Sequence, residues 1–372
     1  MAEKYHNFFR SLDETDIKII KAIEVVGPRN VLGIARLIGI TPGSIYPRIR
    51  RFKRTGVWVY ASIRSLMLGL LPILVLVDEV PSKSRLVEEA LTVIPYVKYL
   101  ARCYGRVNGW CAIYTVPIQH VAGLRDFLLR VEEKGLIKSL ELYEITGFDP
   151  FLPDFSYYDT KRKVWNFNWE EWFTLLKQDA FGRFKFSESV MYLGKALDKL
   201  DIELCAQLEK NSFRRIVELA KVLKKPVSTV KYRYDRLVRR GVIKKHVILT
   251  LPFPPDKSDI ILTKFVCSRH DLLERLAAGL TRTPYIASIA KVIGQNAMFV
   301  YLYMPKPDLL NFVRVISRLA EQGYIRDYSF VILLTETAKS WGIPSHLFRE
   351  EGGWNWNYED YVKKLEGIIR GA

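Results

Sequence analysis

The residues ITPGSIYPRIRRFKRTGV, from Ile40 to Val57, join a turn sequence to a strongly basic helix, and they decide how the amino-terminal region folds. Three apolar residues at helical spacing mark the buried face of this helix: Ile45, Ile49 and Phe52. Because Pro47 would interrupt a helix that had already begun at Pro42, the register predicts that the helix begins at Ser44, with this serine as the N-cap. The stretch therefore predicts a turn followed by a helix with one buried and one basic face.

Two further helices are predicted upstream of this stretch, and one strand is predicted downstream. Apolar residues follow helical spacing in Asp13–Val26 and in Val31–Ile38, whereas Val57–Ile63 alternates as a β-branched strand. Three helices followed by a strand pair form a winged helix-turn-helix. We therefore expect this fold at the start of the chain.

The same pattern recurs later in the sequence. A shift of 185 positions aligns Leu12–Val57 with Leu197–Val242 without a gap, and 12 of these 46 pairs are identical. A shift of 189 positions aligns Trp165–Trp172 with Trp354–Tyr361, and both segments contain Trp-Asn-x-Asn. One unit of roughly 180 residues therefore occurs twice.

Each unit continues with alternating strands and helices. In the first unit, strands are predicted at Leu70–Asp78, Val97–Tyr104, Trp110–Val116 and Ile137–Thr146, and helices at Lys83–Ile94 and Ile118–Lys134. In the second unit, strands are predicted at Ile260–Cys267, Ile286–Val292, Ala297–Tyr303 and Ile325–Thr335, and helices at Asp271–Leu280 and Pro307–Glu321. The order β-α-β-β-α-β is the ferredoxin-like pattern, in which an antiparallel sheet carries helices on one face.

The motifs LDETDIKII, IGITPGS and IYPRIRRFKRTGV resemble those of the Lrp/AsnC (feast/famine) transcription regulators. The stretch ARCYGRVNGWCAIYTV is similar to the Cys-Tyr strand and glycine turn of the effector domain in that family. The resemblance implies DNA binding by the helix-turn-helix and a βαββαβ effector domain behind it. The family usually has an acidic residue three positions after the glycine of this turn, where the present chain has Asn108 and Ala297.

The expected fold class is α+β, with two winged helix-turn-helix domains and two ferredoxin-like βαββαβ effector-type domains in tandem. The winged domains are predicted at residues 1–64 and 195–251, the effector-type domains at 65–148 and 252–336, the aromatic tails at 149–178 and 337–372, and a linker at 179–194. Each aromatic tail is expected to pack on the effector-type domain of its own unit. The alternative is an aromatic anchor for a partner, which would be the other unit, a second copy of the chain or the transcription machinery.

The charge balance indicates a polyanionic partner. The chain has 57 Lys and Arg against 40 Asp and Glu, which gives a net charge of +17 and favours nucleic acid or an acidic membrane surface. The longest apolar run, Leu66–Val77, is too short to span a bilayer. Four cysteines without a CxxC pair argue against a disulfide framework and a zinc site. We therefore expect a cytoplasmic protein with no membrane partner.

The two basic helices carry the candidate DNA-binding residues. They are Ser44, Tyr46, Arg48, Arg50, Arg51 and Arg54 in the first unit, and Ser228, Thr229, Lys231, Tyr232, Arg233, Arg236, Arg239, Lys244 and Lys245 in the second. A helix fits the major groove, where Ser, Lys and Arg contact base edges, while Lys and Arg on the wing suit phosphates. The alternative is a solvated basic face on a winged helix that binds protein.

Catalytic motifs are absent from the sequence, and the five histidines show no metal-ligand spacing. No cofactor and no enzyme activity are expected. Siroheme decarboxylases, however, are similar to the Lrp/AsnC regulators in both domains, which leaves one enzyme alternative. Their tetrapyrrole pocket involves a histidine near the Cys-Tyr strand, where this chain has Arg102 and Ala290.

The sequence as a whole predicts a transcription regulator that binds double-stranded DNA as a single-chain pseudo-dimer. The two basic helices differ at outward positions, with Arg50 in one and Asp235 in the other, which predicts a binding site without two-fold symmetry. The alternative function is a scaffold that recruits proteins of the transcription machinery. Pairing of two chains into a homodimer is compatible with either reading.

Overall fold

The computed structural model describes residues 2–186 and 197–371, which are called here the first and second halves of the chain. The first half begins with four helices and a strand: α1 (Ala2–Arg10), α2 (Glu14–Val26), α3 (Val31–Ile38), α4 (Pro42–Thr55) and β1 (Val59–Ile63). Asp13 caps α2, since its side chain accepts a hydrogen bond from the Asp16 amide and the Asp16 side chain accepts one from the Asp13 amide. The side chains Ile45, Ile49 and Phe52 of α4 are buried, as their spacing predicted.

The helix α4 begins at Pro42 rather than at Ser44. Thr41 is its N-cap residue, and the Ser44 amide donates to the Thr41 carbonyl at 3.1 Å. Proline suits the first position of a helix because its fixed φ is already helical. Pro47 lies inside the helix and removes one backbone hydrogen bond, and burial of one continuous apolar face offsets this loss.

The second half begins with a matching series of elements: α8 (Lys199–Lys210), α9 (Ile216–Leu223), α10 (Val227–Arg239) and β9 (Ile243–Ile248). The strands β1 and β9 pair with each other in antiparallel register, with Val59 opposite Ile248. The winged helix-turn-helix expected for each half would have a strand pair of its own, and that part of the expectation is wrong. Each half supplies one strand, and the two single strands satisfy each other's backbone groups.

Behind these helices, each half contains four strands and two helices. The first half has β2 (Leu70–Glu79), α5 (Ser84–Leu91), β3 (Val97–Gly105), β4 (Gly109–Pro117), α6 (Val121–Glu133) and β5 (Ile137–Glu144). The second has β10 (Ser258–Val266), α11 (His270–Leu280), β11 (Ile286–Lys291), β12 (Ala297–Pro305), α12 (Lys306–Glu321) and β13 (Asp327–Leu333). The strand order is β5-β2-β4-β3 in one half and β13-β10-β12-β11 in the other, and β3 pairs with β13 to join them.

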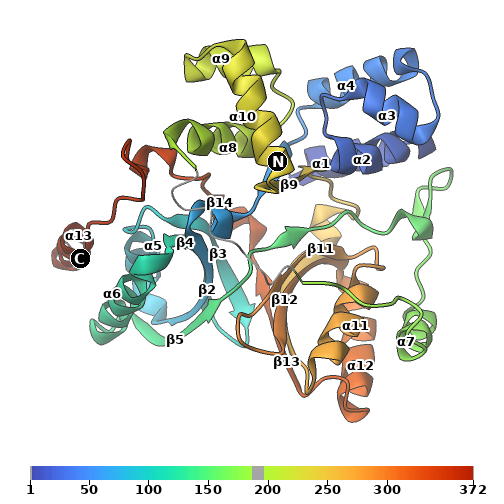
Figure 1. Cartoon of the computed structure of the whole chain (residues 1–372). Helices are drawn as coiled ribbons and strands as arrows, with labels where there is room; N and C mark the ends of the chain where they lie inside the picture. The colour runs from blue at the N-terminus through green and yellow to red at the C-terminus, as the bar shows by residue number, and fades with distance from the viewer. Residues whose placement is uncertain (1, 187–196, 372) are drawn as a thin grey trace.

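The two groups of strands face each other, and each carries its helices on the outer side (Figure 1). The strand β2 shows how this arrangement uses the sequence. Ile73, Val75 and Val77 pack in the core that includes α5 and α6. Leu74 and Leu76 belong to a separate core between the two groups of strands, together with Phe299 and Val331. A strand buried on both faces explains why this segment reads as a continuous apolar run.

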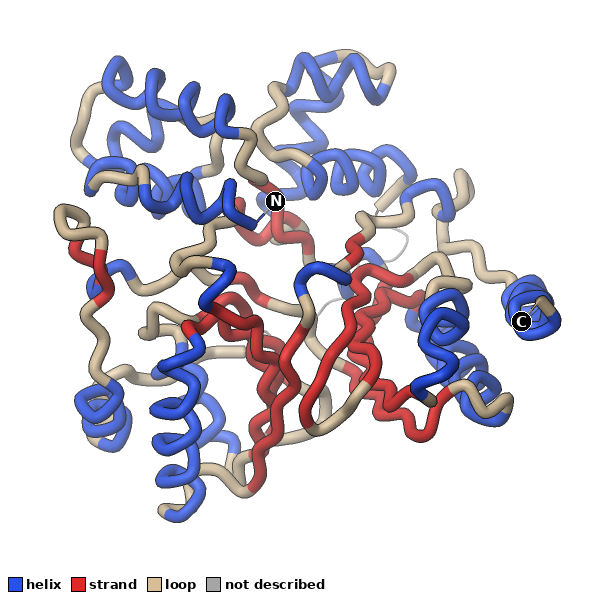
Figure 2. Tube along the Cα trace, turned by 180° about the vertical axis from the view of Figure 1, so that it is seen from behind, coloured by secondary structure: helices blue, strands red, loops and turns tan. Residues whose placement is uncertain are grey.

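Viewed from behind, the strands lie between helices on both sides, and a layer of helices covers one end (Figure 2). That layer includes α2–α4 and α8–α10, which we call the first and second three-helix units. None of the described helices combines the length and the apolar character that a membrane crossing requires. All four cysteines are buried free thiols.

The aromatic tails are exchanged between the halves. The helix α7 (Trp169–Lys177) of the first tail packs on α11 and α12, and the Trp172 indole donates to the Gly279 carbonyl at 2.8 Å. The helix α13 (Tyr358–Arg370) of the second tail packs on α5 and α6, and the Trp354 indole donates to the Leu68 carbonyl at 2.8 Å. The expectation that each tail covers its own domain is therefore wrong.

Rings complete both of these contacts. Trp169 stacks on Tyr285 at 5.3 Å between ring centroids, and Trp356 stacks on His120 at 5.2 Å. These side chains close the helical face of the opposite half, so that each half contributes part of the core of the other. Of the predicted linker, residues 187–194 lie outside the described part of the chain.

Candidate nucleic-acid interface

The helices α4 and α10 hold most of the candidate residues and lie in the same helical layer at one end of the molecule (Figure 1). The candidate side chains that are exposed on α4 are Ser44, Tyr46, Arg50, Arg51 and Arg54. Exposed side chains on α10 are Ser228, Lys231, Tyr232 and Arg239, and Thr229 is half-buried. Each helix is held by its apolar face, which in α10 consists of Val230 and Leu237. The outward faces are thus free to meet a ligand.

Two arginines of α4 bind the capping carboxylates of α2. Arg48 Nη1 lies 2.7 Å from Asp13 Oδ2 and 2.6 Å from Asp16 Oδ1, and Arg51 also pairs with Asp16. The Asp16 side chain has no solvent exposure, and Arg51 keeps 43% of its own. Burial raises the pKa of Asp13, but the hydrogen bonds from Arg48 and the Asp16 amide, together with the charges of Arg48 and Arg51, outweigh that effect, so this pKa lies below its ordinary value. These arginines fasten α4 to α2.

The second three-helix unit repeats this arrangement. Arg233 Nη1 lies 2.7 Å from Asp198 Oδ2 and 3.1 Å from Asp201 Oδ2, and Arg236 also pairs with Asp201. Burial raises the pKa of Asp201 above its ordinary value in spite of the two arginines. Arg236, which the sequence placed on the outward face, is turned inward onto this carboxylate.

The arginine–aspartate contacts were missed by the sequence reasoning, although a signal for them exists. Asp13 and Asp16 align with Asp198 and Asp201 at the same shift of 185 positions that aligns the arginines. Charged pairs that recur together in both copies indicate a shared structural contact. Arg48, Arg51, Arg233 and Arg236 therefore have a positioning role in this structure.

The outward face of α10 carries an internal ion pair. Lys231 Nζ lies 2.5 Å from Asp235 Oδ1, one helical turn further along. The side chains are 57% and 43% exposed. The residue of α4 that corresponds to Asp235 is Arg50, for which the described residues provide no ion-pair partner. The two helices thus present different charges.

The predicted wing residues lie on β9, in the contact between the halves. Lys244 pairs with Asp149, and Lys245 Nζ lies 3.5 Å from Glu24 Oε1. His246 is buried, with Ser212 Oγ at 2.8 Å from its Nδ1 and Tyr234 Oη at 3.2 Å from its Nε2. The described residues therefore form no free basic wing, because β9 pairs with β1.

The two three-helix units also touch through side chains. The Arg29 guanidinium donates to the carbonyls of Ser212 and Arg214, at 2.9 and 3.2 Å, and lies 4.3 Å from the ring centroid of Tyr234. The Trp58 indole donates to the Lys210 carbonyl at 3.0 Å. These contacts, together with the β1–β9 pair, fix the two units relative to each other.

Arg102 and Ala290, the residues named for the tetrapyrrole alternative, are both engaged in contacts within the protein. Arg102 pairs with Glu79 at 2.5 Å, and the same carboxylate accepts a hydrogen bond from the Trp110 indole at 2.8 Å. Ala290 is buried in the core between the two groups of strands. Within the described residues, no group of three His, Cys, Asp or Glu side chains is arranged to hold a metal ion.

Comparison with known proteins connects this geometry to a family. A family model described as winged helix-turn-helix DNA-binding matches residues 197–244, which span α8 to the start of β9. The HTH-type transcriptional regulator PH1916 of Pyrococcus horikoshii is 35% identical over 129 residues, which are 35% of this chain and 79% of that protein. PYRAB16920 of Pyrococcus abyssi, another regulator of this type, is 33% identical over 133 residues, or 36% of this chain and 82% of that protein.

The chain therefore belongs to the HTH-type transcriptional regulators. Each of these relatives matches only about a third of the present chain, whose length is more than twice theirs. Among solved structures, the siroheme decarboxylase NirDL has the same overall fold, with a TM-score of 0.55 at 13% identity. The match covers 96% of this chain and 99% of that protein. At this level of identity the likeness concerns the fold.

Proposed function

We propose that the chain regulates transcription by binding double-stranded DNA through α4 and α10, its two recognition helices. The observation that carries this proposal is that both helices expose basic and hydroxyl side chains within one helical layer. The family supports the same function. The net charge of +17 also favours a polyanionic ligand.

We also propose that the chain is a single-chain pseudo-dimer that arose by tandem duplication. Two winged helix-turn-helix domains and two ferredoxin-like effector-type domains would then take the places of two subunits. The recurrence of α2-α3-α4-β1 as α8-α9-α10-β9 supports this arrangement, as does the matching strand order in the two halves.

The candidate contacts divide into two groups with different tasks. Direct contacts to DNA are assigned to the half-buried Thr229 and to the exposed residues Ser44, Tyr46, Arg50, Arg54, Ser228, Lys231, Tyr232 and Arg239. Arg48, Arg51, Arg233 and Arg236 orient the recognition helices through their aspartates. Lys244 and Lys245 add positive charge near the junction of the halves and are proposed only as phosphate contacts.

A mobility-shift titration on genomic fragments tests DNA binding directly. Arg50→Ala and Arg239→Ala are expected to weaken binding, each by about tenfold when a base or phosphate contact is lost. Arg125→Ala is the matched control, because Arg125 is also an exposed arginine but lies on α6, which is not one of the recognition helices. Equal losses in all three variants would indicate non-specific charge attraction, and no shift on any fragment would favour the protein-recruiting scaffold.

An enzyme acting on a tetrapyrrole is the second candidate, and the shared fold with the siroheme decarboxylase over nearly the whole chain favours it. The placement of Arg102 on Glu79 and the alanine at position 290 weigh against it, because neither supplies an imidazole. Absorption spectra after addition of an iron tetrapyrrole separate the two candidates. A bound tetrapyrrole would give a shifted visible band, whereas the regulator proposal expects none.

A further inference from the structure

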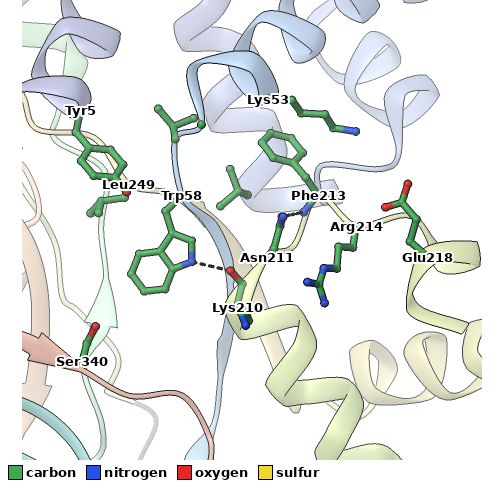
Figure 3. Close-up of a pocket in the computed structure, with 13 residues that line it drawn as sticks. Tyr5, Lys53, Trp58, Lys210, Asn211, Phe213, Arg214, Glu218, Leu249 and Ser340 are labelled. Atoms are coloured by element: carbon green, nitrogen blue, oxygen red, sulfur yellow. Dashed lines mark hydrogen bonds between the residues drawn. The ribbon is translucent and has the colours of Figure 1, made fainter. Parts of the chain in front are cut away.

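A cavity of about 720 Å³ opens between the two three-helix units. One wall comes from the end of α4 and the residues after it, including Lys53 and Trp58, and the other from the α8–α9 connection, including Lys210, Phe213 and Arg214 (Figure 3). This volume lies within the range typical of small-ligand sites. The cavity therefore has room for a ligand that touches both halves at once.

The cavity contains an available aromatic surface. The Trp58 side chain is 38% exposed although it lies in the contact between the halves. Its indole nitrogen is already satisfied by the Lys210 carbonyl, and its ring packs on Tyr60 at 4.7 Å between centroids. Tyr5 and Phe213 add further rings to the lining. A flat aromatic ligand would find a partner for stacking here.

Positive charge predominates in the same cavity. Three cations line it, Lys53, Lys210 and Arg214, against one carboxylate, Glu218. Glu218 is paired with Arg215 at 2.7 Å, and that contact lowers its pKa. Within the described residues, neither lysine has a carboxylate oxygen within ion-pair distance. The arrangement is suited to an anionic group that takes the place of the missing carboxylates.

A related cavity in the same molecule provides an internal comparison. It has a volume of about 770 Å³ and lies between the α2–α3 connection and α10. The 185-residue shift relates Lys53 to Val238, which lines this second cavity. It relates Trp58 to Ile243 and Lys210 to Val25, neither of which is among the lining residues.

The two cavities also differ in the contacts of their corresponding arginines, Arg214 in the first and Arg29 in the second. Arg29 corresponds to Arg214, but its guanidinium donates to two carbonyls and contacts the Tyr234 ring. Within the described residues, the Arg214 guanidinium donates to the side chain of Gln207. The second cavity also has basic and tyrosine side chains in its lining, but it contains no tryptophan, and its Lys231 is paired with Asp235. An indole beside two lysines that have no ion-pair partner among the described residues therefore distinguishes the first cavity.

We propose that this first cavity binds a small aromatic carboxylate. The ring stacks on Trp58, and the carboxylate is held by Lys53, Lys210 and Arg214. The ligand joins the end of α4 to the second three-helix unit, so that its binding is coupled to the relative position of the two recognition helices. This site goes beyond the proposed DNA contacts and does not depend on them.

Calorimetric titration of the full chain without DNA tests the proposal. The probes are indole-3-acetate, salicylate and 2-naphthoate, with indole-3-ethanol as the neutral match and acetate as the aliphatic match. At least one aromatic carboxylate is expected to bind with one site per chain, and both matched compounds are expected to bind at least about tenfold more weakly. Trp58→Ala and Lys210→Ala should each weaken binding by about tenfold or more.

Arg239→Ala is the matched control, because Arg239 lines the second cavity. The affinity of the Arg239→Ala variant for the probe should equal that of the unchanged chain. The Trp58→Phe variant should retain most of the affinity, because phenylalanine still provides an aromatic ring. The proposal is overturned by the absence of saturable heat up to about 10 mM of each aromatic carboxylate. Equal binding of the neutral match, or affinity that survives both Trp58→Ala and Lys210→Ala, overturns it as well. Because no DNA is present, these results leave the DNA-binding proposal to its own test.

Discussion

Arg48 Nη1 lies 2.6 Å from Oδ1 of Asp16, and this contact fastens α4, a proposed recognition helix, to the helix α2. The Asp16 carboxylate has no solvent exposure, so it depends on Arg48, Arg51 and the Asp13 amide for its partners. Arg233 and Asp201 form the same contact in the second half, at 3.1 Å. The orientation of both recognition helices thus depends on charged contacts that start at a capping box.

Arg51→Ala is expected to loosen the first three-helix unit, since it removes one partner of a buried carboxylate. Such a loss costs about 1–3 kcal/mol in the free energy of local opening. Hydrogen exchange measured by mass spectrometry should show faster exchange in α2 and α4. Arg50→Ala, the neighbouring exposed arginine, should stay within about 0.5 kcal/mol of the unchanged chain. Unchanged exchange in Arg51→Ala, together with lost DNA affinity, would mean that Arg51 turns outward to DNA.

DNA binding is expected to depend steeply on salt. If the exposed cations of the two recognition helices and their surroundings neutralise about 6–10 phosphates, log K against log[salt] should have a slope of about −5 to −9. The measurement is a fluorescence-anisotropy titration at several salt concentrations. A slope near zero on a fragment that still binds would contradict contact with the DNA backbone.

The preferred site is expected to lack two-fold symmetry. Arg50 can donate to guanine O6 and N7, whereas Asp235 can only accept, for instance from cytosine N4, and Lys231 already holds that carboxylate. Selection from random DNA should return two unlike half-sites, separated by about one helical turn or a multiple of it. In footprints, Arg50→Ala should disturb protection at one end and Lys231→Ala at the other. A perfect palindrome, weakened alike at both ends by both variants, would indicate two chains that pair through one kind of helix.

The exchanged tails predict destabilisation at a distance in sequence. Trp172→Ala should increase hydrogen exchange in α11 and α12 of the second half, and Trp354→Ala should increase it in α5 and α6 of the first. Loss of a buried tryptophan costs about 3–5 kcal/mol. Trp341→Ala is the control, because 38% of that side chain is exposed. Faster exchange confined to the half that contains the substitution would contradict the exchange of tails.

The burial of His246 predicts that the folded chain loses stability in acid. Burial, with the nearby Arg29 charge as a second cause, lowers the pKa of His246 from 6.5 to about 3. The folded chain therefore keeps this imidazole neutral, while the unfolded chain takes up a proton below its ordinary pKa. The contribution is present in full above about pH 6.5 and is lost as the pH falls towards 3, at about 1.4 kcal/mol per pH unit. His246→Gln should flatten this part of the pH dependence in urea unfolding, and an unchanged profile would contradict the assignment.

Local patterns in the sequence predicted most of the secondary structure. The helix expected at Val31–Ile38 has these bounds in the structure, and the strand expected at Trp110–Val116 is Gly109–Pro117. Periodicity reports which face of a segment is buried, and burial dominates the stability of such elements. The start of α4 was misplaced because a local rule against Pro47 was weighed without the tertiary burial of its apolar face.

Contacts between distant segments left no periodic trace. The partner of β1 lies about 185 residues further along the chain, and nothing in Val59–Ile63 distinguishes pairing with a neighbour from pairing with β9. The same holds for the aromatic tails, whose spacing indicated amphipathic helices but not which half they cover. At the candidate interface, residue type predicted cations on the outward faces, but it could not separate Arg50, which has no ion-pair partner among the described residues, from Arg51, which binds Asp16.

The exchange of the tails also bears on how the chain is made. The first half cannot close its helical face until Trp354 and Trp356 have been synthesised, about 200 residues after β5 ends. At 5–20 residues per second, the apolar surface around Tyr96 stays uncovered for roughly 10–40 s on the ribosome. During that time the first half exposes part of its apolar core, and a chaperone would bind that surface. A gene cut between the halves would therefore yield two incomplete proteins, each lacking the cover that the other carries.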